Sequence, residues 1–181
     1  NSQPDEDVTN DTVNVNTYGC QFVLSGTYTV GGTGADFADI TEVMEALQYC
    51  GVSGPVEFKL ASGNYGNMSF STPIPGASNS HTVTFTSASG NANDVVVGSG
   101  GIALSLADAE HLVFKNLTFG DTTDNTTYGA QLMGMCYNIE ISECNIYSSI
   151  TATSTSYAAV NCDNQGQAKY LREVRFLNNN I

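Results

Sequence analysis

The sequence has few positively charged residues and no tryptophan. Its 181 residues include five Lys plus Arg against eighteen Asp plus Glu, which gives a formal net charge of −13. A surface with so few cations cannot attract a phosphate backbone or an anionic membrane, so we exclude nucleic acid as a partner. A polyuronate would bind tightly only if a metal bridged the carboxylates.

Long apolar runs and a secretion signal are missing as well. No stretch of about eighteen apolar residues occurs, so we predict no membrane insertion. Because no signal peptide opens the sequence, we expect a mature form or a piece of a longer product. Residues 1–17 contain four acidic residues and no base. We predict that they form an acidic flexible leader or linker, followed by a strand and helix region at 18–55.

The five cysteines show no CxxC spacing, so the sequence gives no indication of a zinc site. Cys20 and Cys50 are a candidate disulfide pair in an oxidising compartment. We expect the other three, Cys136, Cys144 and Cys162, to be small buried apolar residues.

Ser, Thr, Asn and Gly supply much of the polarity, since charged residues make up only 13% of the chain. This composition is typical of a β-rich protein with many turns. Hydrophobic residues make up 41%, enough for one domain with a full core.

Five segments alternate apolar and polar residues, as strands with one buried face do. They are VEFKL (56–60), TVTFTS (82–87), HLVFKNLTF (111–119), NIEISECNI (138–146) and LREVRFLNNNI (171–181). Their first inward apolar residues recur at intervals of 27, 29, 27 and 35 residues: Val56, Val83, Leu112, Ile139 and Val174. A repeat of this length predicts a solenoid.

Further short strands follow within each repeat. A second set is NMSF (67–70), DVVV (94–97), LTF (117–119), NIY (145–147) and NNI (179–181), and a third is GIALSL (101–106), AQLMG (130–134) and AAVNC (158–162). Three short strands per coil, with Asn near the bends, predict an all-β, right-handed parallel β-helix of about five coils over 56–181. A β-sandwich would lack this long repeat, and a leucine-rich repeat would show tighter leucine spacing. Because no cap is visible after the last coil, we expect the polypeptide to continue beyond Ile181.

One helix is predicted after the glycine-rich turn GGTG (31–34). An apolar stripe runs through it, with a capping-box pair at Asp39 and Glu42 and a glycine stop at Gly51; the stripe consists of Ile40, Val43, Met44 and Leu47. A phosphate-binding loop would need Lys and Ser or Thr after the last glycine, where Ala35, Asp36 and Phe37 stand instead. We therefore predict a helix that caps the first coil.

A family resemblance rests on this region. SGTYTVGGTGADFADITEVMEALQYCGVSGPVEFKLASGNYGNMSF (25–70), continued by IPGASNSHTVTFTSASGNANDVVV (74–97), resembles the entry segment of the pectin-lyase-like superfamily of right-handed β-helices. It is most similar to secreted surface proteins of Gram-negative bacteria and also looks like the start of pectin methylesterases. The motifs cover 25–119, and the later coils match by pattern only. The resemblance implies a secreted or cell-surface location and a carbohydrate context.

Candidate site residues are indicated by the family resemblance and by polar and aromatic residues near the predicted turns. Gln131 stands where pectin methylesterases have their first active-site glutamine, but that family's next motif is absent after Asn145, so we assign no catalytic residue. Four turn residues could supply oxygen ligands for calcium: Asp121, Asp124, Asn125 and Asp163. The alternative interpretation is that they are solvated turn residues without a ligand. The candidate sugar-binding residues are Gln131 and three tyrosines on which sugar rings could stack, Tyr128, Tyr147 and Tyr157. The alternative is that these tyrosines only pack at coil corners.

Two functions are consistent with these features. The first is a non-catalytic secreted or cell-surface module: a scaffold, adhesin or glycan-binding domain, with a polysaccharide or surface glycan as its partner. The second is the N-terminal part of a polysaccharide lyase, hydrolase or carbohydrate esterase whose catalytic coils lie downstream. The sequence establishes no cofactor, and calcium is the one candidate that the turn residues suggest.

Overall fold

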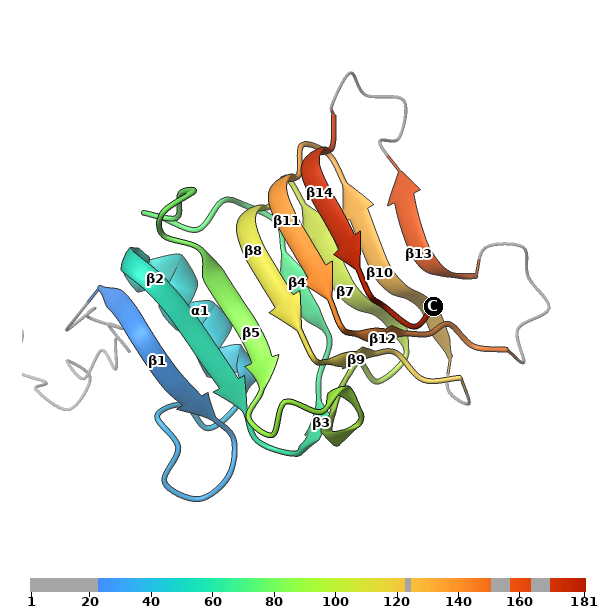
Figure 1. The fold of residues 1–181 in the computed structure, drawn as a ribbon, viewed down its shortest axis with the longest axis horizontal. Coiled ribbons are helices and arrows are strands. Elements are labelled where there is room, and N and C mark those ends of the chain that lie inside the picture. The colour runs from blue at the N-terminus through green and yellow to red at the C-terminus, as the bar shows by residue number, and fades with distance from the viewer. Residues whose placement is uncertain (1–22, 123–124, 151–156, 164–169) are drawn as a thin grey trace, which may run out of the picture.

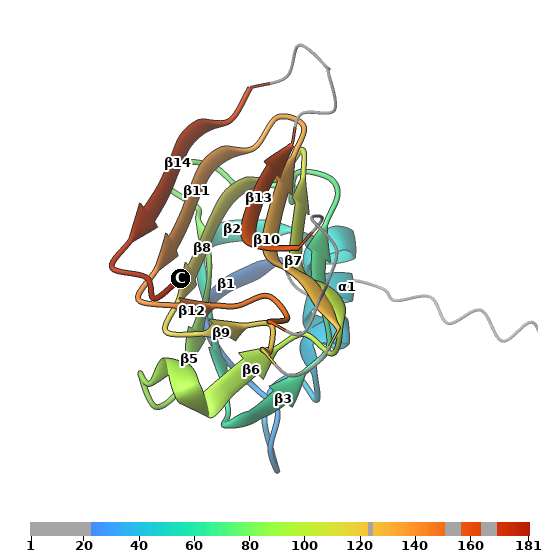
Figure 2. The same ribbon diagram turned by 90° about the vertical axis from the view of Figure 1, so that its right-hand side faces the viewer.

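The chain winds into a parallel β-solenoid. We analysed a computed structural model, which describes residues 23–122, 125–150, 157–163 and 170–181. Three parallel sheets run along the solenoid, and the coils pass through them in turn. Figure 1 shows the molecule from the side, and Figure 2 shows the three sheets from the C-terminal end. Residues 1–17, predicted to be a leader, lie outside the described residues.

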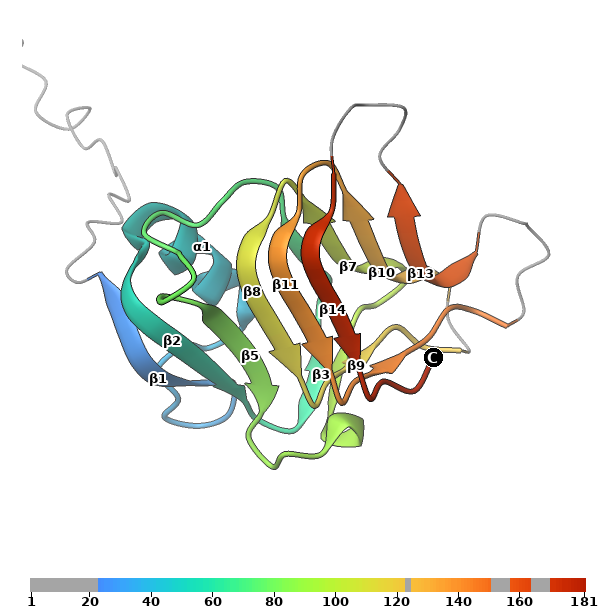
Figure 3. The same cartoon turned by 45° about the horizontal axis from the view of Figure 1, so that its top comes forward.

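Sheet A is the longest of the three sheets and begins each coil (Figure 3). Its spatial order is β1 (Leu24–Val30), β2 (Val52–Leu60), β5 (Val83–Ser87), β8 (Glu110–Lys115), β11 (Tyr137–Ser142) and β14 (Arg172–Leu177). The five residues aligned from the sequence face one another on successive strands: Val56, Val83, Leu112, Ile139 and Val174. The predicted repeat and its register are therefore confirmed.

Sheets B and C complete the coils. Sheet B contains β3 (Gly63–Tyr65), β6 (Val95–Val97), β9 (Thr118–Phe119) and β12 (Asn145–Ile146), with the short 3-10 helix η1 (Ala92–Asp94) before β6. Sheet C contains β4 (Met68–Phe70), β7 (Gly101–Ala107), β10 (Thr126–Met133) and β13 (Ala158–Asp163). The assignment of 67–70 to the second strand of its coil was wrong, because that strand is β3. The three residues of β3 include one apolar side chain, too few to show an alternation.

Stacked aromatic rings fill the core beneath sheet A. The rings of Tyr28, Phe58, Phe85 and Phe114 follow one another at centroid distances of 5.8, 5.2 and 5.5 Å. All three phenylalanines are fully buried. These four strands thus pack their aromatic side chains on one another in sequence, so none of their coils buries its apolar face alone.

The helix α1 (Ile40–Cys50) lies at the N-terminal end of the solenoid (Figures 1 and 2). The Asp39 carboxylate accepts hydrogen bonds from the backbone N–H groups of Thr41 (2.8 Å) and Glu42 (3.1 Å). Glu42 in turn accepts one from the N–H of Ala38 (2.7 Å), as in a capping box. Ile40, Val43 and Leu47 are buried. The predicted helix and its caps are therefore confirmed.

The glycine-rich turn closes the outer edge of β1. The Asp36 carboxylate accepts hydrogen bonds from the backbone N–H (2.8 Å) and the hydroxyl (2.7 Å) of Thr29. Phe37 donates its N–H to the carbonyl of Thr29 (3.1 Å). The backbone N–H of Thr29 is the main cause that lowers the pKa of Asp36 below its usual value. Because these backbone groups are already hydrogen-bonded, a strand of another molecule cannot pair with this part of the edge.

Left-handed residues turn the chain at both ends of the sheet A strands. Three left-handed residues directly precede the first inward residue of their strand. They are His111, Asn138 and Glu173, with φ of 59°, 51° and 54°. After the strands, Asn116, Glu143 and Asn178 have φ of 53°, 54° and 54°. Asparagine tolerates this conformation better than most residues do, which explains the asparagines expected near the bends.

The free cysteines differ in exposure. Cys136 and Cys144 are buried, as predicted, and burial raises the pKa of Cys144 to about 12. Cys162 is exposed, so the expectation for this residue was wrong. It lies on β13, and β10 is the one strand that pairs with β13 among the described residues. The described helix is too short and too polar to cross a membrane.

Candidate functional site

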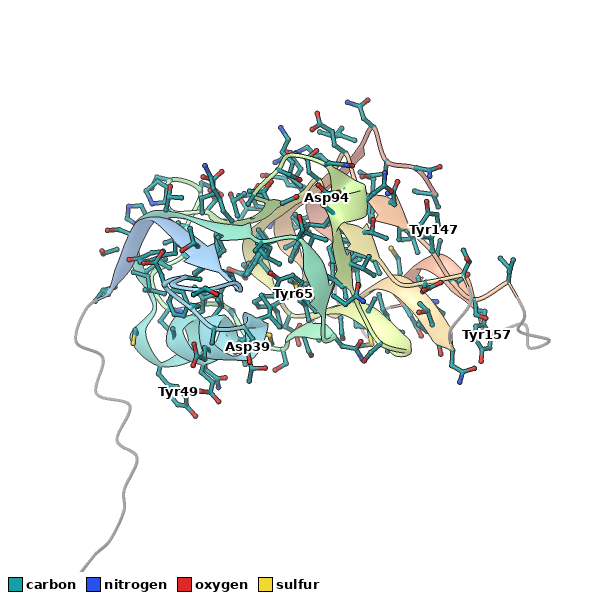
Figure 4. All side chains as sticks on the ribbon, turned by 90° about the horizontal axis from the view of Figure 1, so that it is seen from below. Asp39, Tyr49, Tyr65, Asp94, Tyr147 and Tyr157 are labelled. Atoms are coloured by element: carbon teal, nitrogen blue, oxygen red, sulfur yellow. The ribbon has the colours of Figure 1, made fainter. Side chains whose placement is uncertain are left out.

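The outer face of sheet B carries a row of hydrogen-bonded amide and hydroxyl groups near the C-terminal end. Asn145 Nδ2 donates to Asn93 Oδ1 (3.0 Å) and to Thr118 Oγ1 (3.1 Å). Asn180 Nδ2 donates to Asn145 Oδ1 (3.4 Å) and to Tyr147 Oη (3.0 Å). We call these five residues the amide ladder. Figure 4 views this face and labels Tyr147.

The coil register produces the ladder. Thr118 of β9 faces Asn145 of β12, which forms a parallel bridge with Asn180 in the next coil. The Thr118 hydroxyl donates to the carbonyl of Ala92 (2.8 Å), so its lone pairs are left for Asn145. Both amide hydrogens of Asn145 are then used, and its Oδ1 accepts from Asn180. The hydrogen-bond network therefore fixes the orientation of the Asn145 side-chain amide.

Several polar groups of the ladder still face solvent. Asn93 and Asn180 are exposed, and Tyr147 is half-buried. Asn93 Nδ2, Asn180 Oδ1 and the Tyr147 hydroxyl hydrogen have no hydrogen-bond partner among the described residues. Amides and hydroxyls both donate and accept, as sugar hydroxyls do. The ladder is thus a fixed strip of neutral donors and acceptors beside an aromatic ring.

A groove of about 370 Å³ lies on the same face toward the N-terminal end. Its wall includes Asn64, Tyr65 and the start of α1 near Asp39 (Figure 4). The Tyr65 hydroxyl lies 2.9 Å from the carbonyl oxygen of Ala61 and 3.1 Å from that of Val30, so the ring is held in place as a wall. Asn64 faces Val96, which faces Thr118 of the ladder. The groove and the ladder therefore share one line along sheet B.

The residues predicted to bind sugar are divided between two faces. Tyr147 belongs to the ladder, whereas Tyr128 and Gln131 lie on β10 of sheet C. Gln131 is buried and donates a hydrogen bond to Asn161 Oδ1 (3.3 Å). Tyr157 immediately precedes β13 and is half-buried. The structure therefore does not unite the four residues in one site.

The residues predicted to bind calcium do not form one cluster either. Asp121 and Asn125 are exposed residues of the turn between β9 and β10, and Asp124 lies outside the described residues. Asp163 faces Met133 at the other end of β10. At ~3.3 Å per residue this separates it from Asn125 by about 26 Å along the strand. Within the described part of the chain no three His, Cys, Asp or Glu residues could hold a metal.

A second polar cluster lies at the start of the sheet A strands. Arg175 donates to Asn138 Oδ1 (3.4 Å) and to Glu140 Oε2 (3.3 Å). Because Arg is only a donor, the Asn138 amide nitrogen must point to His111 Nδ1, 3.1 Å away. His111 then carries its proton on Nε2, 3.8 Å from Glu110 Oε2. We call these five residues the histidine cluster.

Within the histidine cluster the imidazole itself is buried, whereas Arg175 is exposed and the glutamates are half-buried. His111 is 7% exposed and packs edge-on against Tyr137 at a centroid distance of 5.3 Å. The guanidinium of Arg172 covers the Tyr137 ring at 5.5 Å. The imidazole is therefore sealed beneath the surface, and its visible role is to hold neighbouring coils together.

Neither cluster was predicted, although the sequence held a signal for both. The alignment of Leu112, Ile139 and Val174 also aligns the residues beside them, which places His111 next to Asn138 and Glu140 next to Arg175. The same spacing brings Thr118 to Asn145. A search for polar residues at the coil period would have found them.

Only one of the two cysteines in the predicted disulfide lies in the described part of the chain. Cys50, the last residue of α1, is disulfide-bonded. Its predicted partner Cys20 lies outside the described residues, so the Cys20–Cys50 pairing stays a prediction.

Comparisons with known proteins give little further information. No protein-family model matches the chain, and no curated protein matches its sequence. Among solved structures, the chain is similar to the pectin methylesterase from Aspergillus niger in two deglycosylated forms. The identities are 14% and 15% and the TM-scores 0.34 and 0.32, each over 87% of this chain and 86% of the other. Because these TM-scores are low, we draw no conclusion from the two structures. The fold is established by the strand pairing of the chain itself, which forms a three-sheet parallel β-solenoid.

Proposed function

We propose that this protein is a secreted or cell-surface β-solenoid module that binds a neutral glycan on sheet B without transforming it. The amide ladder carries this proposal. Asn145 and Asn180 stand on successive coils, ~4.8 Å apart, with Asn93 and Tyr147 hydrogen-bonded beside them, so the ladder can meet successive hydroxyls of an extended sugar chain. The fixed orientation of Asn145 means that little ordering is needed on binding.

Charge supports a neutral ligand. The five ladder residues include no cation, and the whole chain has a net charge of −13. An anionic polysaccharide would be repelled at moderate ionic strength. The disulfide at Cys50 supports an oxidising, extracellular compartment.

The proposal is tested on an array of neutral and anionic glycans at low and high salt. We expect neutral glycans to be retained with little salt dependence. Retention of only acidic glycans, or binding that disappears at high salt, would refute a neutral ladder site.

A second candidate, the N-terminal part of a polysaccharide-degrading enzyme, rests on the chemistry of the histidine cluster, although the His111 imidazole itself is covered. The cluster combines an imidazole, two carboxylates and an arginine, the groups used in acid and base catalysis. Lyase, esterase and hydrolase assays distinguish the two functions. Turnover that is lost in a His111→Ala variant with unchanged melting temperature would favour the enzyme over the binding module.

A further inference from the structure

The groove beside Tyr65 lies where sheet B has no strand. Sheet A begins with β1, one coil before β2, whereas sheet B begins with β3 among the described residues. After β1 the chain enters the glycine-rich turn and α1 instead of adding a strand to sheet B. The groove of about 370 Å³ is lined by this turn, by residues 38–41 and by residues 62–67. It therefore lies at one end of the line along sheet B that joins Asn64 to Asn145.

The edge of β3 that faces away from β6 carries an open backbone donor and acceptor. Gly98 donates its N–H to the carbonyl of Tyr65 (3.0 Å), so the backbone groups of Tyr65 point to β6. Successive residues of a parallel strand direct these groups to opposite sides. The N–H and carbonyl of Asn64, which lines the groove, therefore point away from β6 and have no partner among the described residues. One donor and one acceptor are too few to hold a further strand, but they match a hydroxyl, which both donates and accepts.

A carboxylate oxygen of Asp39 is also available in the groove. Asp39 Oδ1 accepts both cap bonds of α1, from Thr41 and Glu42. The side chain is exposed, and its Oδ2 has no hydrogen-bond partner in the described part of the chain. The lining of the groove contains this one acid and no Lys or Arg. An uncharged sugar can donate hydroxyl hydrogens to the carboxylate, whereas an acidic sugar would be repelled.

We infer that this groove is an end subsite, which takes the uncharged terminal residue of the glycan bound on the amide ladder; the inference rests on the proposed function. The Asn64 backbone and Asp39 Oδ2 bind hydroxyls of that residue, beside the fixed ring of Tyr65. Figure 4 shows Asp39 and Tyr65 near each other on the face that also carries Tyr147. Because the glycine-rich turn and the start of α1 form the far wall, the sugar chain ends there.

The distance between the two sites sets the length of glycan that can use both. Asn64, Val96, Thr118 and Asn145 face one another on successive strands, so three coil steps separate the first from the last. At ~4.8 Å per coil this is ~14 Å. A sugar chain shorter than this reaches the ladder alone, whereas a longer one reaches the ladder and the groove together.

A pair of oligosaccharides tests this inference. The probes have about two and about six residues, shorter and longer than the ~14 Å span, and are cut from the neutral polysaccharide that the glycan array retains most strongly. In calorimetric titration we expect the wild type to bind the long probe at least about tenfold more tightly than the short one, since only the long probe joins two sites.

Two variants remove the subsite in different ways. Gly66→Leu fills the groove without strain, because φ of Gly66 lies outside the left-handed region and an added Cβ would meet no atom within 4 Å. Asp39→Asn removes the charge but keeps the helix cap, since Asn caps a helix as well as Asp does. Each should lower the affinity for the long probe about tenfold and leave that for the short probe within about twofold. Ser53→Leu, which adds the same side chain at an exposed position of β2, should change neither affinity.

The outcomes separate the groove from the ladder, with thermal melts to establish that each variant is folded. Long-probe binding that survives both Gly66→Leu and Asp39→Asn but is lost in Asn145→Ala would leave the ladder standing and overturn the end subsite. A wild-type protein that binds both probes equally would overturn it as well. If the array retains no neutral polysaccharide, or if Asn145→Ala binds both probes as the wild type does, the proposed function itself fails.

Discussion

Phe85 lies at the centre of the aromatic column, and its truncation tests whether the coils depend on one another. Its ring stacks between Phe58 at 5.2 Å and Phe114 at 5.5 Å, and Phe70 lies 5.7 Å away. The side chain is fully buried. Phe85→Ala therefore removes contacts to three rings in three different strands.

The expected loss of stability follows from burial and from the cavity. A buried Phe→Ala change costs about 3–5 kcal/mol, and we expect the upper part of this range because two stacked pairs are lost. With a urea m-value of about 2 kcal/mol/M, the unfolding midpoint should fall by roughly 2 M.

The assay is urea unfolding followed by far-UV circular dichroism. Ile150→Ala is the matched control, since the Ile150 side chain is 80% exposed and its truncation should change the free energy of unfolding by no more than about 0.5 kcal/mol. If Phe85→Ala cost less than about 1 kcal/mol, the column would not hold the coils together and the packing argument would fail.

Three further predictions concern single positions. Asp36→Asn should lower stability at pH 7; because the pKa of Asp36 is lowered from 3.8 in the fold, the difference from wild type should shrink as the pH falls below that value. A difference that is constant with pH in thermal melts would contradict this role. Gly51→Ala should cost more than about 2 kcal/mol, since φ is 67° and the added Cβ would clash with the Pro75 carbonyl oxygen, whereas Gly34→Ala (φ 78°, open space) should cost about 1 kcal/mol. Equal unfolding midpoints for the two variants would show that the contact is unimportant. Among the three free cysteines of the described residues, a thiol reagent should label only Cys162 in the native protein, because Cys136 and Cys144 are buried. Labelling of Cys144 without unfolding would be inconsistent with its position.

The fold could be predicted from the sequence because its repeat is carried by inward apolar residues. Val56, Val83 and Leu112 are spaced by whole coils, and alternation marks the face that each strand buries. The helix could be predicted equally well, because the residues that cap it, Asp39 and Gly51, directly adjoin it in the sequence. Prediction failed at β3, where a strand of three residues contains too few apolar side chains to show a period.

The candidate site was harder to predict because it depends on contacts between coils. Asn93 and Asn145 are 52 residues apart and meet only through the stacking of η1 and β12. Tyr147 was named as a candidate because an aromatic residue near a turn is conspicuous, and its role in binding sugar stays a prediction. Its partner Asn180 was hidden among the asparagines of residues 178–180.

Calorimetric titration of a neutral glycan identified on the array tests the central claim most directly. With Asn145→Ala we expect affinity to fall at least about tenfold, since the change removes the amide that orients Asn93 and Asn180. Gln131→Ala, on sheet C, should bind as the wild type does. If Gln131→Ala lost binding while a folded Asn145→Ala variant retained it, the glycan site would lie on sheet C and the account of the amide ladder would be wrong.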